Sequence, residues 1–454
     1  MLTREEAQRL AAKVLSYSSF PECTVLLSET EESYTRFANN GITNAGFSER
    51  RSIVINSTRE QKTGVIRIDE IDDAQLRAAV KRSEELAAIA PPNPEHQPPP
   101  GPQKYPDIAA YDDETARARS PQMIPQVRSV VEAAAAKKLV AAGLFERTQI
   151  TEAVTNKAGL FGYQRAADAR MSTTIRYPDG SSSGWAGQPA ARIRDINGAA
   201  LAATAIDKCV KWRNPKRMEP GKFTVVFEPT AAGDIVRLLV GGGFGGGFGG
   251  GFGGPFSARA TEEGRTFLSK KGGGTLVGEK LFPDFITLRT DPADPRQPAT
   301  PWSADLLPNR PVTWIEKGVI KNLQYDRYWA ARTGHEPTPS PSTLIMDGGD
   351  ASLEDLIKGV ERGLLVTHFW YIRFVNQQTV QHTGLTRDGL FLIEDGKITQ
   401  PVMNFRFNDS PVNLLKNTVK LGRPVRVRGL EGAQMIVPAI LSKDFNFTSI
   451  SDAV

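Results

Sequence analysis

PVTWIEKGVIKNLQY, Pro311 to Tyr325, shows the pattern that decides the fold class of this chain. Two apolar runs stand on either side of Glu316-Lys317-Gly318, a polar and glycine-containing segment typical of a tight turn. GLFLIEDGKI, Gly389 to Ile398, repeats the arrangement around Glu394-Asp395-Gly396-Lys397. Both segments predict antiparallel hairpins, because tight turns join neighbouring strands that run in opposite directions.

The rest of the second half is also dominated by short apolar runs typical of strands. These runs are FTVVFEP (223–229), FITLRTDP (285–292), HFWYIRF (368–374) and PVMNFRF (401–407).

The first half mixes helices and strands. Thr3 and Glu6 make a capping box, and apolar residues follow at helical spacing. Further helices are expected at about 73–90, at 124–142 with Gly143 as the C-cap, and at 198–212. Tyr177-Pro178-Asp179-Gly180 is expected to form a turn. Four strands are expected to form an antiparallel meander: CTVLLSE (23–29), SYTRFAN (33–39), RSIVINST (51–58) and KTGVIRID (62–69). The chain is therefore predicted to be α+β.

Two domains are expected, 1–215 and 216–454, with the break NPKRMEPGK (214–222) between them. Residues 91–106 hold eight prolines, which exclude a helix or a central strand and predict an extended crossover within the first domain. Residues 241–255 repeat Gly-Gly-Gly-Phe and predict a flexible loop that carries Phe244, Phe248 and Phe252.

Composition limits the class of protein. The 454 residues are 40% hydrophobic and 24% charged, which predicts a folded, soluble chain. A formal net charge of +5 is too small for its size to indicate a nucleic-acid partner. Cys23 and Cys209 are too distant in sequence to form a C-x-x-C pair, so a reducing compartment fits best. Neither a signal peptide nor a membrane span is expected, and we predict a cytoplasmic protein.

Three catalytic motifs fail on their context. Gly180-Ser181-Ser182-Ser183-Gly184 fits G-x-S-x-G, but Trp185-Ala186-Gly187-Gln188-Pro189 follows where a nucleophile elbow needs a helix. In GGTLVGEK (273–280), Glu279 replaces the phosphate-binding lysine of a P-loop. His335-Glu336 resembles the start of a zinc-protease helix, but Pro337 and Pro339 prevent that helix.

Two histidines remain as possible metal ligands. His368 and His382 could face each other across a pair of strands, although packing is the commoner role for a histidine among aromatic residues. His96 lies in the proline-rich crossover and needs no such role.

Several ordered segments carry a resemblance to the TldD/PmbA family, also called the modulator of DNA gyrase family. They are TRFANN (35–40), ARMSTTIRYPDGSSSGWA (169–186), FSARATEEGRTFLSKKGGGTLVGEKLFPDFITLRTDP (256–292), TWIEKGVIKNLQYDRYWA (313–330) and VPAILSKDFNFTS (437–449). The resemblance implies an N-terminal α/β domain, a β-rich C-terminal domain with antiparallel sheets, and a dimer around an internal cavity.

In the family, TldD-type members hydrolyse extended peptides with a metal held by a His-Glu-x-x-x-His helix and a distant cysteine. The glutamate that follows the first histidine can act on metal-bound water. Here the resemblance places Val240 and Phe244 at the histidine positions, Gly241 at the glutamate and Arg428 at the cysteine. It therefore implies a TldE/PmbA-like chain without its own metal or catalytic residues.

The leading hypothesis is a non-catalytic subunit that binds extended peptide at a sheet edge while a TldD-type metalloprotease partner supplies zinc. A peptide-binding homodimer is a variant. The enzyme alternative is an active metallopeptidase with a non-standard site at His368 and His382. The family's name also suggests a nucleic-acid or gyrase-binding protein, but the charge does not support one. The resemblance implies four peptide contacts at the cavity: Arg265, Lys270, Thr275 and Tyr325.

Overall fold

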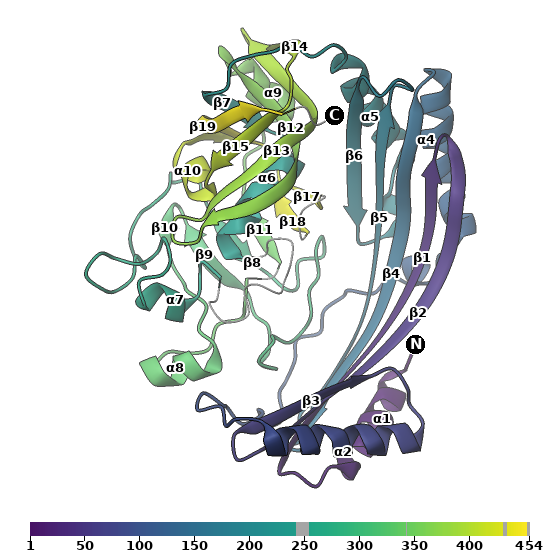
Figure 1. Cartoon of the computed structure of the whole chain (residues 1–454), viewed down its shortest axis with the longest axis vertical. Helices are drawn as coiled ribbons and strands as arrows, with labels where there is room; N and C mark the ends of the chain where they lie inside the picture. The colour runs from purple at the N-terminus through teal and green to yellow at the C-terminus, as the bar shows by residue number, and fades with distance from the viewer. Residues whose placement is uncertain (242–253, 342, 430–433, 452–454) are drawn as a thin grey trace.

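A computed structural model describes residues 1–241, 254–341, 343–429 and 434–451. A long curved sheet built from the first part of the chain stands beside a compact, strand-rich second part (Figure 1). Helices and antiparallel sheets are both extensive, so the predicted α+β class with a β-rich C-terminal region is confirmed.

The N-terminal sheet has six antiparallel strands in the order β3-β2-β1-β4-β5-β6. Because side chains alternate between the faces of a strand, Val25 and Leu27 point to the helices while Thr24 and Leu26 point the other way. The strands are β1 (Glu22–Ala38), β2 (Gly41–Arg59), β3 (Lys62–Ile68), β4 (Val140–Asn156), β5 (Phe161–Arg176) and β6 (Ser183–Ala190).

Helices cover one face of this sheet at both ends (Figure 1). The helices α1 (Arg4–Tyr17) and α2 (Asp73–Ile89) pack on β1 and β2. The helices α4 (Ser120–Ala136) and α5 (Gly198–Lys211) pack on β4, β5 and β6. The predicted capping box of Thr3 and Glu6 is present, as is the predicted turn in which Gly180 N–H donates to the Tyr177 carbonyl. The helices are α1 (Arg4–Tyr17), α2 (Asp73–Ile89), the short α3 (Asp113–Arg117), α4 (Ser120–Ala136), the 3-10 turn η1 (Ile193–Asp195) and α5 (Gly198–Lys211).

Two sequence predictions in this part were wrong. The segments 23–29 and 33–39 form one strand, β1, because the intervening carboxylates have partners: Glu29 pairs with Arg51, and Glu31 pairs with Arg147. The helix predicted to reach residue 142 ends at Ala136. Gly143 is not its C-cap but a residue of β4, where an added Cβ would lie 2.5 Å from the Phe37 ring.

The C-terminal part contains a closed barrel and a second sheet. Strands β12, β7, β19, β15 and β13 pair in that order, and β12 pairs with β13 to close the ring. Phenylalanines fill its core, among them Phe227, Phe369 and Phe445. The barrel set is β7 (Lys222–Phe227), β12 (Arg362–Asn376), β13 (Gln381–Glu394), β14 (Lys397–Pro401), β15 (Phe405–Asp409), β16 (Thr418–Leu421) and β19 (Ile440–Ile450).

The second sheet has the order β10-β9-β8-β11-β18-β17. The turns at Glu316-Lys317-Gly318 and Glu394–Lys397 join antiparallel strands, β9 with β10 and β13 with β14, as predicted. The strands are β8 (Leu288–Thr290), β9 (Val312–Glu316), β10 (Val319–Ile320), β11 (Leu344–Met346), β17 (Val425–Val427) and β18 (Met435–Val437). The helices are α6 (Pro229–Val236), η2 (Arg237–Val240), α7 (Ala258–Glu262), α8 (Arg327–Thr333), α9 (Leu353–Lys358) and α10 (Pro411–Lys416).

The proline-rich segment 91–106 contains neither helix nor strand, as predicted. It leaves α2 and passes between the sheet and the C-terminal part, where Arg259 binds Glu95 and Arg327 donates to the Pro98 carbonyl. Most of the Gly-Phe repeat, including Phe244, Phe248 and Phe252, lies outside the described residues. Within the described ranges, no helix is long and apolar enough to cross a membrane.

Candidate functional site

Helix α6 and the turn η2 occupy the place where the sequence resemblance puts the metal-binding helix. They follow β7 directly, and α6 packs in the core with Ile235 and Val236 buried. Val240 ends η2 half-buried, and the exposed Gly241 follows with φ of 83°. Positive φ ends a right-handed helix, so the helix that would carry the metal motif stops at this point. Phe244 lies outside the described residues.

The segment Val427-Arg428-Gly429 at the end of β17 lies against α6. A Cβ added at Gly233 would lie 2.9 Å from Val427, and one added at Gly429 would overlap the buried carboxylate of Asp234. The structure therefore brings together two segments, 233–241 and 427–429, to which the resemblance assigns metal ligands.

Arg428 makes the electrostatics of this place unfavourable for a metal cation. Its guanidinium is half-buried, and burial lowers its pKa, with Arg170 and Arg426 acting in the same direction and Glu146 opposing them. The charge nevertheless persists at neutral pH, because arginine titrates far above it.

The donor set at these described positions does not fit zinc. Zinc takes cysteine sulfur, histidine nitrogen or carboxylate oxygen, whereas Val240 offers carbon, Gly241 has no side chain and Arg428 carries a positive charge. Among the described residues, no three histidine, cysteine, aspartate or glutamate side chains gather as a metal site would require.

A polar cluster joins the two parts of the chain beside Arg428. Asp168 on β5 accepts hydrogen bonds from Arg426 at 2.7 Å and from Gln434 at 2.8 Å. Burial raises the pKa of Asp168, although both partners oppose the shift. These residues line a cavity of about 310 Å³. The hydrogen bonds to Asp168 hold the second sheet against β5.

His368 and His382 do not face each other, and the predicted alternative at this pair was wrong. The register of β12 and β13 pairs His368 with Arg387 and Phe374 with His382. Positions 382 and 387 are five residues apart on β13, or about 17 Å at the rise of a strand. One metal ion cannot bind both rings.

Each histidine has a packing role instead. His368 is 1% exposed, lies with its ring 5.1 Å from that of Trp185 and has its Nε2 3.3 Å from the Asp388 carboxylate. Burial lowers the pKa of His368 to about 4. The His382 Nδ1 lies 2.9 Å from the Val380 carbonyl, and burial lowers its pKa as well.

The four predicted peptide contacts lie around α7 or in the loop that follows it. Arg265 pairs with Glu263, and Lys270 lies 2.9 Å from Glu279. Thr275 forms an isolated β-bridge with Ser269. Tyr325 donates to Glu262 at 3.2 Å, and its ring stacks on the His335 ring. Burial raises the pKa of Tyr325 to about 12. None of the four lines the pocket described next.

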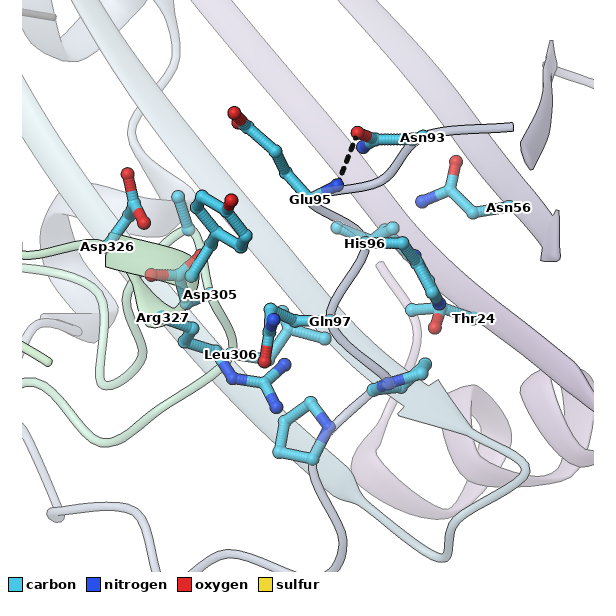
Figure 2. Close-up of a pocket in the computed structure, with 15 residues that line it drawn as sticks. Thr24, Asn56, Asn93, Glu95, His96, Gln97, Asp305, Leu306, Asp326 and Arg327 are labelled. Carbon is cyan, nitrogen blue, oxygen red and sulfur yellow. Dashed lines mark hydrogen bonds between the residues drawn. The ribbon is translucent and has the colours of Figure 1, made fainter. Parts of the chain in front are cut away.

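A pocket of about 440 Å³ lies between the N-terminal sheet, the proline-rich segment and the C-terminal part. Figure 2 shows Asp305 and Asp326 on one wall and Thr24 and Asn56 on the opposite wall. Glu95, His96 and Gln97 of the proline-rich segment cross between these walls. His96 lines this pocket, a position that the sequence did not predict, and its Nε2 lies 2.7 Å from the Glu22 carboxylate.

The pocket continues along the inner face of the sheet, the face opposite the helices. A cavity of about 280 Å³ shares Leu26 with it, and a further cavity of about 630 Å³ shares Ser28, Ser52 and Arg67 with the second. We call this continuous row the sheet trough. Sequence reasoning missed it, although small polar residues alternating with apolar ones in 23–30 were an available signal.

Together, a long antiparallel sheet with helices on one face and a trough on the other, next to a closed barrel, defines an α+β class of two-part protein. The family model described as the PmbA/TldA metallopeptidase C-terminal domain matches residues 220–449. The chain belongs to the PmbA/TldD family.

Three solved structures share the fold, each with a TM-score of 0.83. TldE from Thermococcus kodakarensis is 19% identical and is matched over 98% of this chain and 100% of its own. A candidate modulator of DNA gyrase from Thermotoga maritima is 17% identical, with 97% and 100% covered. Another from Bacteroides thetaiotaomicron is 20% identical, with 99% and 100% covered.

A metalloprotease from Methanothermobacter thermautotrophicus is 22% identical over 238 residues. The match covers 49% of this chain and 47% of that protein, so the chain spans about half the length of this relative.

Proposed function

We propose that this chain is a TldE/PmbA-like, non-catalytic subunit that binds extended peptide while a TldD-type partner supplies the zinc-dependent hydrolysis. The observation that carries the proposal is the side-chain set of the two assigned segments: Val240, Gly241 and Arg428 provide no ligand and no general base. The likeness to TldE from Thermococcus kodakarensis supports the same subunit type.

The sheet trough supports peptide binding. Its lining on β1 runs from Thr24 to Thr30, about 20 Å at the rise of a strand, which matches about six extended residues. Small polar side chains such as Ser28 and Ser52 leave room for a peptide and can donate or accept hydrogen bonds.

An open strand edge lies at one end of the trough. Within the described residues, β3 pairs with β2 only from Ile53 to Arg59, so residues 41–52 of β2 pair with β1 alone. A strand edge offers backbone groups to which an extended peptide adds as a further strand. Arg265, Lys270, Thr275 and Tyr325 remain proposed contacts on the C-terminal side.

Reconstitution with a TldD-type subunit from the same organism tests the proposal. We expect the two chains to co-elute in size-exclusion chromatography and to cleave a fluorogenic extended peptide only when mixed. The matched control replaces the histidines of the partner's metal motif, which should abolish cleavage. Cleavage by this chain alone, sensitive to a chelator, would contradict the proposal, and a stable homodimer that binds peptide without the partner would favour the homodimer variant.

A further inference from the structure

The pocket in Figure 2 has an excess of negative charge on its walls. Glu95, Asp305 and Asp326 contribute carboxylates, and Arg327 contributes the one guanidinium of the lining. Glu95 is compensated by Arg259 at 2.8 Å, and Arg327 donates to the Pro98 carbonyl at 2.7 Å. Neither Asp305 nor Asp326 has an ion pair within the described part of the chain, so these two carboxylates are left for a ligand to compensate.

Asp305 and Asp326 act on each other. Burial raises the pKa of Asp305, and repulsion from Asp326 raises it further, while Arg327 opposes both effects. Asp326 is held in place because its Oδ1 accepts the Trp329 N–H at 2.7 Å as the N-cap of α8. A cation in the pocket would offset this repulsion, because a nearby positive charge stabilises the ionised form of both carboxylates.

Thr24 on the opposite wall is a second, independent sign of a ligand. Its side chain is 7% exposed and belongs to the strand face that lines the pocket. Its hydroxyl makes no hydrogen bond to any residue that the structure describes. Because Thr24 lines the pocket, a ligand donor there can supply a partner for this hydroxyl.

The pocket is also large enough and of suitable shape for a long basic side chain. It shares Leu26 with the next cavity of the sheet trough, so a side chain of a peptide in the trough lies close to it. Tyr328 adds an aromatic ring to the lining, and such rings attract cations through their faces. Proline-rich chain around Pro99 and Pro100 provides apolar contact for the methylene groups.

We propose that this pocket binds the cationic side chain of an arginine or lysine in the extended peptide, with Asp305 and Asp326 as its counter-ions and Thr24 as a hydrogen-bond acceptor. The inference rests on the proposed peptide binding and adds a preference for basic peptides. Arginine fits the site better than lysine, because its planar guanidinium presents five N–H donors in a fork that matches carboxylate oxygens.

Fluorescence anisotropy with full-length protein tests the inference. The probes are two labelled hexapeptides, acetylated and amidated, that are identical except for a central arginine or citrulline, its neutral isostere. We expect the arginine peptide to bind at least tenfold more tightly. Asp305→Asn should remove most of this difference, and Asp326→Asn should reduce it while keeping the helix cap. Asp350→Asn removes one exposed carboxylate outside the pocket and should change nothing.

The outcomes separate the two proposals. Equal affinity for both peptides, or a preference that persists in Asp305→Asn, would overturn the cationic pocket and leave peptide binding intact. Absence of binding by either peptide would overturn both. Circular dichroism and thermal unfolding of Asp305→Asn establish that the variant is folded, and Asp326→Asn provides the second measurement if it is not.

Discussion

At the scale of single residues, Val240 and Arg428 carry the proposal that this chain is not a metal-dependent peptidase. Val240 ends the turn that follows α6, and Arg428 lies in the segment that contacts α6. A cation and an aliphatic group cannot be converted into zinc ligands by small movements of the backbone. The proposed loss of catalysis therefore depends on side-chain chemistry and not on a difference in fold.

His368 carries a prediction about pH. Its pKa is about 4 in the folded protein and near 6.5 when unfolded, so below pH 6.5 the unfolded state takes up a proton that the folded state does not. This group should therefore lower the free energy of unfolding by about 2 kcal/mol between pH 7 and pH 5. His368→Phe keeps a ring beside Trp185 and should lose less stability over that interval. Urea unfolding at both pH values checks this, and an equal loss in both proteins would contradict it.

At the scale of elements, Gly184 shows how a motif can have a structural cause. The G-x-S-x-G match at 180–184 lies at the start of β6, where Ser182 donates to the Cys209 carbonyl. A Cβ at Gly184 would overlap the backbone of α5 and lie 2.6 Å from Cys209 N. Glycine is required because helix and strand approach closely.

Gly184→Ala should consequently lower the free energy of unfolding by about 2–3 kcal/mol, the usual effect of forcing an extra methyl group into a packed contact. Gly180→Asn is the matched control. Gly180 has φ of 73° in open space, a conformation that asparagine tolerates, so this variant should stay within about 0.5 kcal/mol of the parent. Urea unfolding curves measure both, and similar stability of the two variants would show that the close packing is misassigned.

The elements that the sequence predicted correctly are those with local signals. The capping box at Thr3, the turn at Tyr177 and the hairpin at Glu316–Gly318 are all present. The errors arose where distant partners decide. Glu29 and Glu31 suggest a break in the strand, because their ion-pair partners Arg51 and Arg147 are distant in sequence. Gly143 suggests a helix cap, because its close packing against Phe37 is also a contact between distant residues.

The candidate site shows the same limit. Resemblance placed Val240 and Arg428 at two segments that the structure brings together. The pocket between Thr24 and Asp305 could not be predicted, because it joins residues from the sheet, the proline-rich segment and a loop almost three hundred positions away. The pairing of His368 and His382 failed because the turn between β12 and β13 lies at 377–380, close to His382, whose partner across the strands is therefore Phe374.

At the scale of the whole molecule, we propose that the two domains meet at the break 214–222. Two of the contacts across this boundary lie next to the break: Trp212 donates to the Val402 carbonyl at 2.9 Å, and Lys208 on α5 lies 2.6 Å from Glu228 before α6. The Lys208 and Glu228 side chains are 10% and 15% exposed. A buried ion pair of this kind fixes the domains relative to each other more than it stabilises them.

Removing one member of this pair should be costly. Lys208→Met leaves the Glu228 carboxylate buried without its counter-ion and should lower the free energy of unfolding by about 3 kcal/mol. The double variant with Glu228→Leu removes both charges and should recover most of that loss. Unfolding in urea compares the three proteins, and a double variant no more stable than Lys208→Met would contradict the assignment.

The zinc content of the purified protein tests the central claim most directly. Protein prepared without chelators, incubated with equimolar zinc and passed through a desalting column is measured by inductively coupled plasma mass spectrometry. A non-catalytic subunit should retain far less than one zinc per chain, whereas a TldD-type protein treated in parallel should retain one. One tightly bound zinc per chain, accompanied by peptidase activity that a chelator removes, would contradict the account.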